Sequence, residues 1–258
     1  MKHKLTYQPD PPDSMDQVFT SSINPEYKAG ILRVFSIHEY TPISQQGGLG
    51  SCVANAVCDA FELVLGSRLP IGSPPPQLSR LGLYTVCRQY DGTFPADAGT
   101  YCRTGLRQAS KIGCCLESDY PYVESLVGTP LPTEMVVRAS ENRLSNYRRI
   151  VTTGAARSRQ IQQAIAEEKP VIFGTLVGSN FDNPALGSVL SPPADAQGGH
   201  AMVVVGYRYT PSGEVEFRIR NSWGTAWGEN GYTWFTESYM TWDRTSDLWV
   251  VDWTPDVI

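Results

Sequence analysis

The fold of this 258-residue chain is decided by the stretch Gln46-Gly47-Gly48-Leu49-Gly50-Ser51-Cys52-Val53-Ala54-Asn55-Ala56. From Val53 to Leu65 the apolar residues recur at the spacing of one helix face. Ser51 is a plausible N-cap and Gly66 a plausible stop. The pattern therefore predicts a helix that is buried on one side and carries Cys52 in its first turn.

This position suggests chemistry for Cys52. Free N–H groups and the positive end of the helix dipole favour a thiolate there, and the thiolate is the reactive form of cysteine. A lone cysteine in an apolar helix is nevertheless usually an inert packing residue. A catalytic role for Cys52 therefore depends on partners elsewhere in the chain.

His200 and Asn221 are the candidate partners. His200 opens an apolar run, Ala201 to Val205, that reads as a buried strand. Asn221 follows the alternating segment 215–220, and Pro211-Ser212-Gly213 supplies a turn between the two. A hairpin of this kind brings His200 and Asn221 together, so that Asn221 accepts an imidazole N–H and fixes the tautomer.

Gln46 completes the set, because its amide and the backbone N–H of Cys52 would donate to a developing oxyanion. Thiol, imidazole, carboxamide and amide donor are the groups that nucleophilic acyl transfer by cysteine needs. The other two histidines are less suitable: His3 lies in a polar, proline-rich leader, and His38 lies just before the Cys52 loop.

In combination, the residues around Cys52, His200 and Asn221 resemble those of the papain-like cysteine peptidases. The sequence variant around Cys52 resembles a bacterial branch of that family. The resemblance covers about residues 38–250. Further family-like stretches are Leu78-Ser79, Asp97-Ala98-Gly99-Thr100, Asp119-Tyr120-Pro121-Tyr122 and Gly228-Glu229-Asn230-Gly231-Tyr232.

The resemblance implies a two-lobed α+β fold with the active-site cleft between the lobes. Residues 1–37 would form an N-terminal leader, either a strap that partly covers the cleft or a packing arm. Residues 38–258 would form the catalytic domain. Its helical lobe is expected at about 38–135 and its β-rich, barrel-like lobe at about 136–258.

The resemblance also implies the role of each site residue. Cys52 would attack the peptide carbonyl, His200 would protonate the leaving amine, Asn221 would orient His200, and Gln46 would bind the oxyanion. Substrate-binding positions implied in the same way are Gly99, Thr100, Tyr101, Gly199 and Trp223. Gly99 would pair with the substrate backbone, Thr100 and Tyr101 would border the pocket for the second residue before the cleaved bond, and Trp223 would shield the histidine–asparagine contact.

The chain departs from the family pattern at three places. Leu49 stands where the family usually has a cysteine, so the common disulfide from that position is absent. Val53 replaces a frequent aromatic residue, which alters only local packing. The usual long helical pro-region is missing, and the leader 1–37 is shorter and lacks that helical pattern.

Composition sets the class of protein. With 41% hydrophobic and 18% charged residues the chain can bury a sizeable core. A net charge of −5 without a basic cluster argues against nucleic-acid binding. No apolar run suits a membrane span, and no signal peptide is visible. We therefore expect a cytoplasmic monomer that acts on peptides or proteins, although export by another route stays open.

Two other functions remain open. An acyltransferase or transpeptidase would use the same groups with an amine in place of water. A non-catalytic thiolate or metal-binding module is the second rival, but the cysteine spacings do not suit paired knuckles, and we expect neither metal nor cofactor. We expect most of the remaining cysteines to be reduced packing thiols: Cys58, Cys87, Cys102, Cys114 and Cys115.

Overall fold

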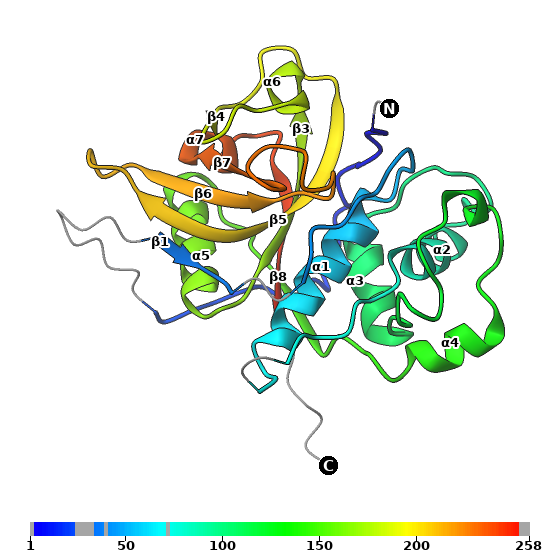
Figure 1. Ribbon diagram of the computed structural model, residues 1–258. Helices are drawn as coiled ribbons and strands as arrows, with labels where there is room; N and C mark the ends of the chain where they lie inside the picture. Colours follow the sequence, from blue (N-terminus) through cyan, green and yellow to red (C-terminus); the bar gives the residue numbers. More distant parts are fainter. Residues whose placement is uncertain (1–2, 24–33, 39–40, 71–72, 253–258) are drawn as a thin grey trace.

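A computed structural model describes residues 3–23, 34–38, 41–70 and 73–252. The two-lobed α+β fold expected from the sequence is confirmed: helices gather in one lobe and a sheet forms the other (Figure 1). The helical lobe contains α1 (Cys52–Gly66), α2 (Arg80–Tyr90), α3 (Cys102–Lys111), a short 3₁₀ helix (Glu124–Leu126) and α4 (Thr133–Ala139).

The β-rich lobe is built on an eight-stranded sheet with three helices around it. Its elements are β1 (Val34–Ser36), β2 (Asn146–Arg149), α5 (Gly154–Ala166), β3 (Val171–Val177), α6 (Ser179–Asp182), β4 (Val189–Leu190), β5 (Gly198–Tyr209), β6 (Val215–Arg220), β7 (Tyr232–Thr236), α7 (Glu237–Met240) and β8 (Ser246–Asp252). The order is β2-β8-β3-β5-β6-β7-β4, and β1 pairs with β5 outside this path. Since β2 and β4 are not paired with each other in the described part of the chain, the sheet stays open and does not close into a barrel.

Helix α1 lies at the centre of the molecule, between the lobes. The expectation of a helix buried on one side is wrong, because every residue of α1 except Leu65 is buried. Helices α2 and α3 pack on one side of it, and β5 and β8 lie on the other. Its ends also differ from expectation: the Ser51 side chain makes no capping bond, and the helix includes Gly66 and is capped by Ser67.

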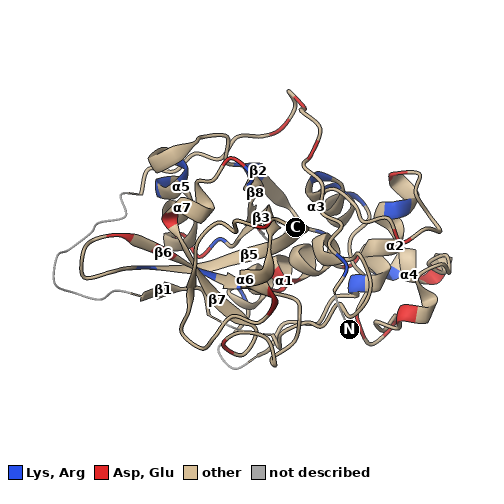
Figure 2. Cartoon of the chain, turned by 90° about the horizontal axis from the view of Figure 1, so that it is seen from above, with Lys and Arg blue, Asp and Glu red and all other residues tan. Residues whose placement is uncertain are grey.

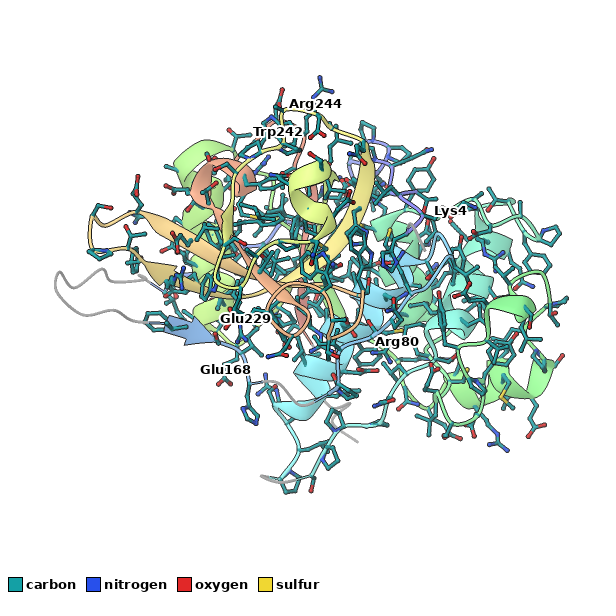
Figure 3. The ribbon with its side chains drawn as sticks, turned by 45° about the horizontal axis from the view of Figure 1, so that its top comes forward. Lys4, Arg80, Glu168, Glu229, Trp242 and Arg244 are labelled. Carbon is teal, nitrogen blue, oxygen red and sulfur yellow. The ribbon has the colours of Figure 1, made fainter. Side chains whose placement is uncertain are left out.

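A buried cluster of charged groups on α1, α2 and β6 joins the two lobes. Asp59 and Glu62 of α1 both bind Arg80 of α2, with N–O distances of 2.7 and 2.6 Å. Asp59 also binds Arg220, the last residue of β6, at 3.2 Å. Arg80 lies beside α1 in Figure 3. Because Arg220 immediately precedes Asn221, this cluster ties the position of Asn221 to the helix that carries Cys52.

The leader belongs to both lobes. Its N-terminal end lies between them in Figure 1, and β1, within the leader, pairs with β5 of the sheet. Phe19 is buried, and its N–H donates to the carbonyl of Arg149 at 2.8 Å. Asp10 is also buried, and it accepts the Trp249 indole N–H at 3.0 Å. Of the leader, residues 1–2 and 24–33 lie outside the described residues.

Candidate active site

Cys52 is the first residue of α1, and its side chain is fully buried. Burial raises the pKa of its thiol, and hydrogen bonds from the backbone at Ala201 and Val53 and from Thr6 of the leader lower it by less. The net direction is opposite to the one expected for a helix N-terminus open to solvent. With the leader in place, Cys52 is therefore favoured as a neutral thiol.

His200 lies inside β5, because that strand begins at Gly198. Its Nε2 lies 2.7 Å from Oδ1 of Asn221. The same oxygen accepts the N–H of Ser222 at 2.8 Å, which fixes the asparagine amide with its oxygen toward the ring. Nε2 therefore carries the proton, and Nδ1 is left with a lone pair. Nδ1 is buried and has no hydrogen-bond partner among the described residues.

Aromatic rings surround the imidazole. The ring centroid of Trp223 lies 5.0 Å from that of His200, and that of Phe181 lies 5.8 Å away. Burial lowers the pKa of His200 to about 4; the bond to Asn221 acts against this effect, and the nearby His3 adds to it. Burial thus moves both pKa values toward the neutral imidazole and the neutral thiol.

Gln46 has a fully buried side chain whose two ends are both held. Its Oε1 accepts the hydroxyl of Ser222 at 2.7 Å, and its Nε2 donates to the Leu49 carbonyl at 3.1 Å. An amide nitrogen has two hydrogens, so one remains for an incoming oxyanion. Tyr122 supports the same loop by donating to the Gln46 carbonyl at 2.8 Å.

The leader occupies the space in front of these groups. The ring of His3 stacks on Trp223 at 4.3 Å, and its Nδ1 lies 2.9 Å from the Gly47 carbonyl. Lys4 reaches the helical lobe, where its Nζ binds the Asp97 carboxylate at 2.7 Å (Figure 3). Thr6 donates to the Gly50 carbonyl at 2.8 Å. The leader therefore covers Cys52 and extends from the Gln46 loop to Asp97 of the helical lobe.

Three of the five expected substrate-binding positions lie against the leader. The carbonyl of Gly199 accepts the N–H of Tyr7 at 3.1 Å, and Trp223 carries the His3 ring. Gly99 has a φ of +80°, and a Cβ atom there would lie 2.8 Å from the carbonyl oxygen of Thr6. These three positions are contacted by a peptide segment of the chain itself.

Thr100 and Tyr101 are the other two expected positions. The Thr100 hydroxyl lies 2.6 Å from the carboxylate of Asp91, within the helical lobe. Tyr101 is half-buried and immediately precedes α3. A role for either in binding substrate stays a prediction.

Sequence reasoning missed three side chains near the site. Ser222 holds the Gln46 amide, Asp97 binds the N–H of Gly50 and the hydroxyl of Tyr84, and Asp247 binds leader groups. Ser222 directly follows Asn221 and could have been found from that position. Asp97 lies in one of the family-like stretches, but its contacts, like those of Asp247, are with residues remote in sequence.

All six cysteines are free and buried. Within the described ranges, no three His, Cys, Asp or Glu side chains gather in a way that could hold a metal ion. No helix of these ranges is long and apolar enough to span a membrane. Figure 2 shows basic and acidic positions distributed over both lobes.

Most of this chain is similar to known cysteine proteases. The family model described as "Papain family cysteine protease" matches residues 33–245. An uncharacterised peptidase C1-like protein of Acanthamoeba polyphaga mimivirus is 29% identical over 93% of this chain and 79% of its own length. Human cathepsin L2 is 25% identical over 74% of this chain, which spans 56% of it.

Solved structures extend the likeness to the whole fold. The crystal structure of xylellain, a cysteine protease from Xylella fastidiosa, matches with a TM-score of 0.82 at 25% identity and covers 98% of each chain. A digestive procathepsin L 3 of Tenebrio molitor larval midgut matches in fold with a TM-score of 0.69 over 92% of this chain and 74% of its own. Taken with the family match over residues 33–245, the chain belongs to the papain family of cysteine proteases.

Proposed function

We propose that this protein is a cysteine peptidase in which Cys52, His200, Asn221 and Gln46 carry the reaction. The observation that carries the proposal is the 2.7 Å contact between His200 and Asn221 beside the helix that starts at Cys52. Gln46, held by Ser222 from the same asparagine loop, supplies the amide donor. These groups come from three distant patches of sequence.

In the reaction, the thiolate of Cys52 attacks the carbonyl carbon of the scissile peptide bond. The second N–H of the Gln46 amide and the backbone N–H of Cys52 donate to the oxyanion that forms. The imidazolium of His200 gives its proton to the leaving amine, and a thioester remains on Cys52. His200 then takes a proton from water, which attacks the thioester and releases the acid and the free thiol.

Replacing Asn221 by alanine is expected to reduce kcat/KM less than replacing His200, since it removes the group that orients the ring and not the proton carrier. Loss of the general acid–base in the His200 variant should lower kcat/KM roughly 10²–10⁴-fold.

The pH profile of the wild type should be bell-shaped, because Cys52 and His200 titrate as a pair. Steady-state rates from pH 4 to 10 test this, and a flat profile would count against the pair.

We further propose that the leader restrains the peptidase by occupying its cleft. Thr6 lies against Cys52, and Tyr7 bonds the carbonyl that precedes His200. A tethered segment competes with substrate at high effective concentration. Burial beneath the leader also favours the neutral forms of both Cys52 and His200, and these are the wrong ionic forms for attack.

The double substitution His3→Ala and Lys4→Ala is expected to raise kcat/KM on a small peptide roughly 10-fold. It removes one ring stack, worth about 1 kcal/mol, and one exposed ion pair, worth about 0.5 kcal/mol. Met15→Ala is the matched control, because Met15 lies in the same leader and is exposed. Rates and thermal melts of the three proteins decide the matter: unchanged rates in a folded double variant would make the leader purely structural.

The acyltransferase alternative uses the same residues and differs only in the acceptor. Product analysis of wild-type reactions with and without added amines separates the two. Hydrolysis products alone favour the peptidase, whereas amide products at modest amine concentration favour transfer.

A further inference from the structure

The loop from Gln46 to Cys52 carries both candidate oxyanion donors, one at each end. They are the side-chain amide of Gln46 and the backbone N–H of Cys52. Three of the seven residues of this loop are glycine, and Gly47 has a φ of +58°. Glycine gives a backbone little stiffness of its own. The distance between the two donors must therefore be fixed by contacts across the loop.

The Tyr122 hydroxyl joins the two ends of this loop. It donates to the Gln46 carbonyl at 2.8 Å and lies 2.6 Å from the Ser51 hydroxyl. A phenol has one hydrogen, which the carbonyl takes, so Ser51 is the donor to Tyr122. The Ser51 oxygen in turn accepts an amide N–H of Asn55 at 3.0 Å. One chain of hydrogen bonds therefore runs from α1 to the Gln46 backbone, and its members strengthen one another.

Burial makes this chain of hydrogen bonds costly to break. Ser51 and Asn55 are buried, and so is Gln46. The N–H of Tyr122 donates to the Glu117 carboxylate at 2.6 Å, which fixes the backbone of the tyrosine. Burial raises the pKa of Tyr122, so its phenol stays a neutral donor. Without the hydroxyl, the buried Gln46 carbonyl and the Ser51 hydroxyl would each lose a partner.

The leader also contacts this loop, but those contacts are lost when substrate replaces it. His3 Nδ1 lies 2.9 Å from the Gly47 carbonyl, and Thr6 donates to the Gly50 carbonyl at 2.8 Å. Under the function proposed above, a bound substrate takes the place of both leader residues. The bonds of Tyr122 come from the helical lobe itself and persist in the active enzyme.

We propose, building on the peptidase function above, that Tyr122 is a positioning residue of the oxyanion site. Its hydroxyl fixes the separation between the Gln46 amide and the Cys52 N–H, so that both donate to one oxygen. Ser222 orients the amide from the β-rich lobe, and Tyr122 holds the backbone that carries this amide. The tyrosine acts only through Gln46 and Ser51.

Tyr122→Phe removes the hydroxyl and keeps the ring. We expect kcat to fall roughly 5–10-fold and KM to change less than about 2-fold, because the oxyanion exists only in the transition state. Tyr120→Phe is the matched control and should keep the wild-type kcat. Tyr120 lies in the same stretch, Asp119-Tyr120-Pro121-Tyr122, and its buried hydroxyl has no hydrogen-bond partner among the described residues.

Alkylation by iodoacetamide separates a misplaced oxyanion donor from a damaged thiol. In this reaction the Cys52 thiolate forms a bond to the methylene carbon and iodide leaves, so no oxyanion develops. Docking of the leader lowers kcat/KM and the alkylation rate constant by the same fraction, so their ratio does not depend on it. We expect this ratio to fall roughly 5–10-fold in Tyr122→Phe and to stay unchanged in Tyr120→Phe.

Combination with Gln46→Ala tests whether Tyr122 acts through that amide. On this background, loss of the Tyr122 hydroxyl should lower kcat less than about 2-fold, since the donor that it positions is gone. Ser51→Ala breaks the same chain one bond earlier. If Tyr122→Phe does not fold, Ser51→Ala takes its place, and the ratio should again fall, by a smaller factor.

A wild-type ratio in folded Tyr122→Phe would overturn the assignment while leaving the peptidase intact. So would a parallel fall of cleavage and alkylation, which indicates a damaged thiol, or an undiminished loss on the Gln46→Ala background. If the wild type is alkylated at Cys52 and cleaves no peptide, the peptidase proposal fails. The role of Tyr122 then fails with it, because no oxyanion forms.

Discussion

Peptide cleavage should be abolished in Cys52→Ala, with a loss in kcat on the order of 10⁵–10⁶, as in acyl-transfer enzymes that lose their nucleophile. The fold should survive, because alanine fits the buried first turn of α1 and has high helix propensity. The measurement is the initial rate on a quenched peptide, with a thermal melt of each protein. Retained turnover would falsify the assignment of the nucleophile.

Cys58→Ala is the matched control for this experiment. Cys58 lies in the same helix, is equally buried and has a free thiol. Burial raises the pKa of both thiols, that of Cys58 well above the usual range, but only Cys52 stands at the start of α1, where the helix N-terminus favours a thiolate once the leader leaves the cleft. A thiol-directed epoxide should therefore label wild type and Cys58→Ala at Cys52 and leave Cys52→Ala unlabelled. Loss of activity in both alanine variants would point to packing and not to chemistry.

Much of the molecule could be predicted from local pattern. Apolar residues at helical spacing located α1, although nearly all of its residues are buried, and alternation located β6, whose side chains are buried in turn against the core. The turn between β5 and β6 implied a hairpin, and the register of that hairpin brings His200 and Asn221 within bonding distance. The His200–Asn221 contact could be predicted because the strand pairing and the turn that produce it are short-range features of the sequence.

Other parts could not be predicted because they depend on distant partners. Strand β2 carries the polar run Asn146–Arg149, and it is a strand only because β8 pairs with it. The path of the leader is set by single contacts such as Lys4 with Asp97 and Tyr7 with Asp247, which lie far apart in the chain. No periodicity encodes such contacts, so sequence alone could not separate a cleft strap from a packing arm.

The ionic states of Cys52 and His200 also could not be predicted from the sequence. A helix N-terminus favours a thiolate, and that argument assumed a solvent-accessible Cys52. In the structure both groups are buried, and desolvation moves both pKa values toward the neutral forms. How deeply the two groups are buried depends on tertiary packing, including the leader residues around Thr6, and no local pattern around Cys52 specifies it.

Gln46→Ala should lower kcat roughly 10²–10³-fold with a much smaller change in KM, because the negative charge it binds exists only in the transition state. The side chain is fully buried and fixed at both ends, so its free N–H points to one place without reorganisation. Gln46→Glu should be no better, since a carboxylate offers no donor and repels the oxyanion. A raised KM with unchanged kcat would mean that Gln46 only positions the substrate.

Ser222→Ala tests whether the Gln46 amide must be held in a fixed orientation to donate to the oxyanion. The variant keeps the Gln46 amide but removes the hydroxyl that holds its oxygen at 2.7 Å. The amide can then rotate and offer its oxygen to the oxyanion, so kcat should fall, by less than in Gln46→Ala, again with little change in KM. The double variant should be no slower than Gln46→Ala alone, because Ser222 acts through that amide. Additive losses would show that the Ser222 hydroxyl acts by a route other than the Gln46 amide.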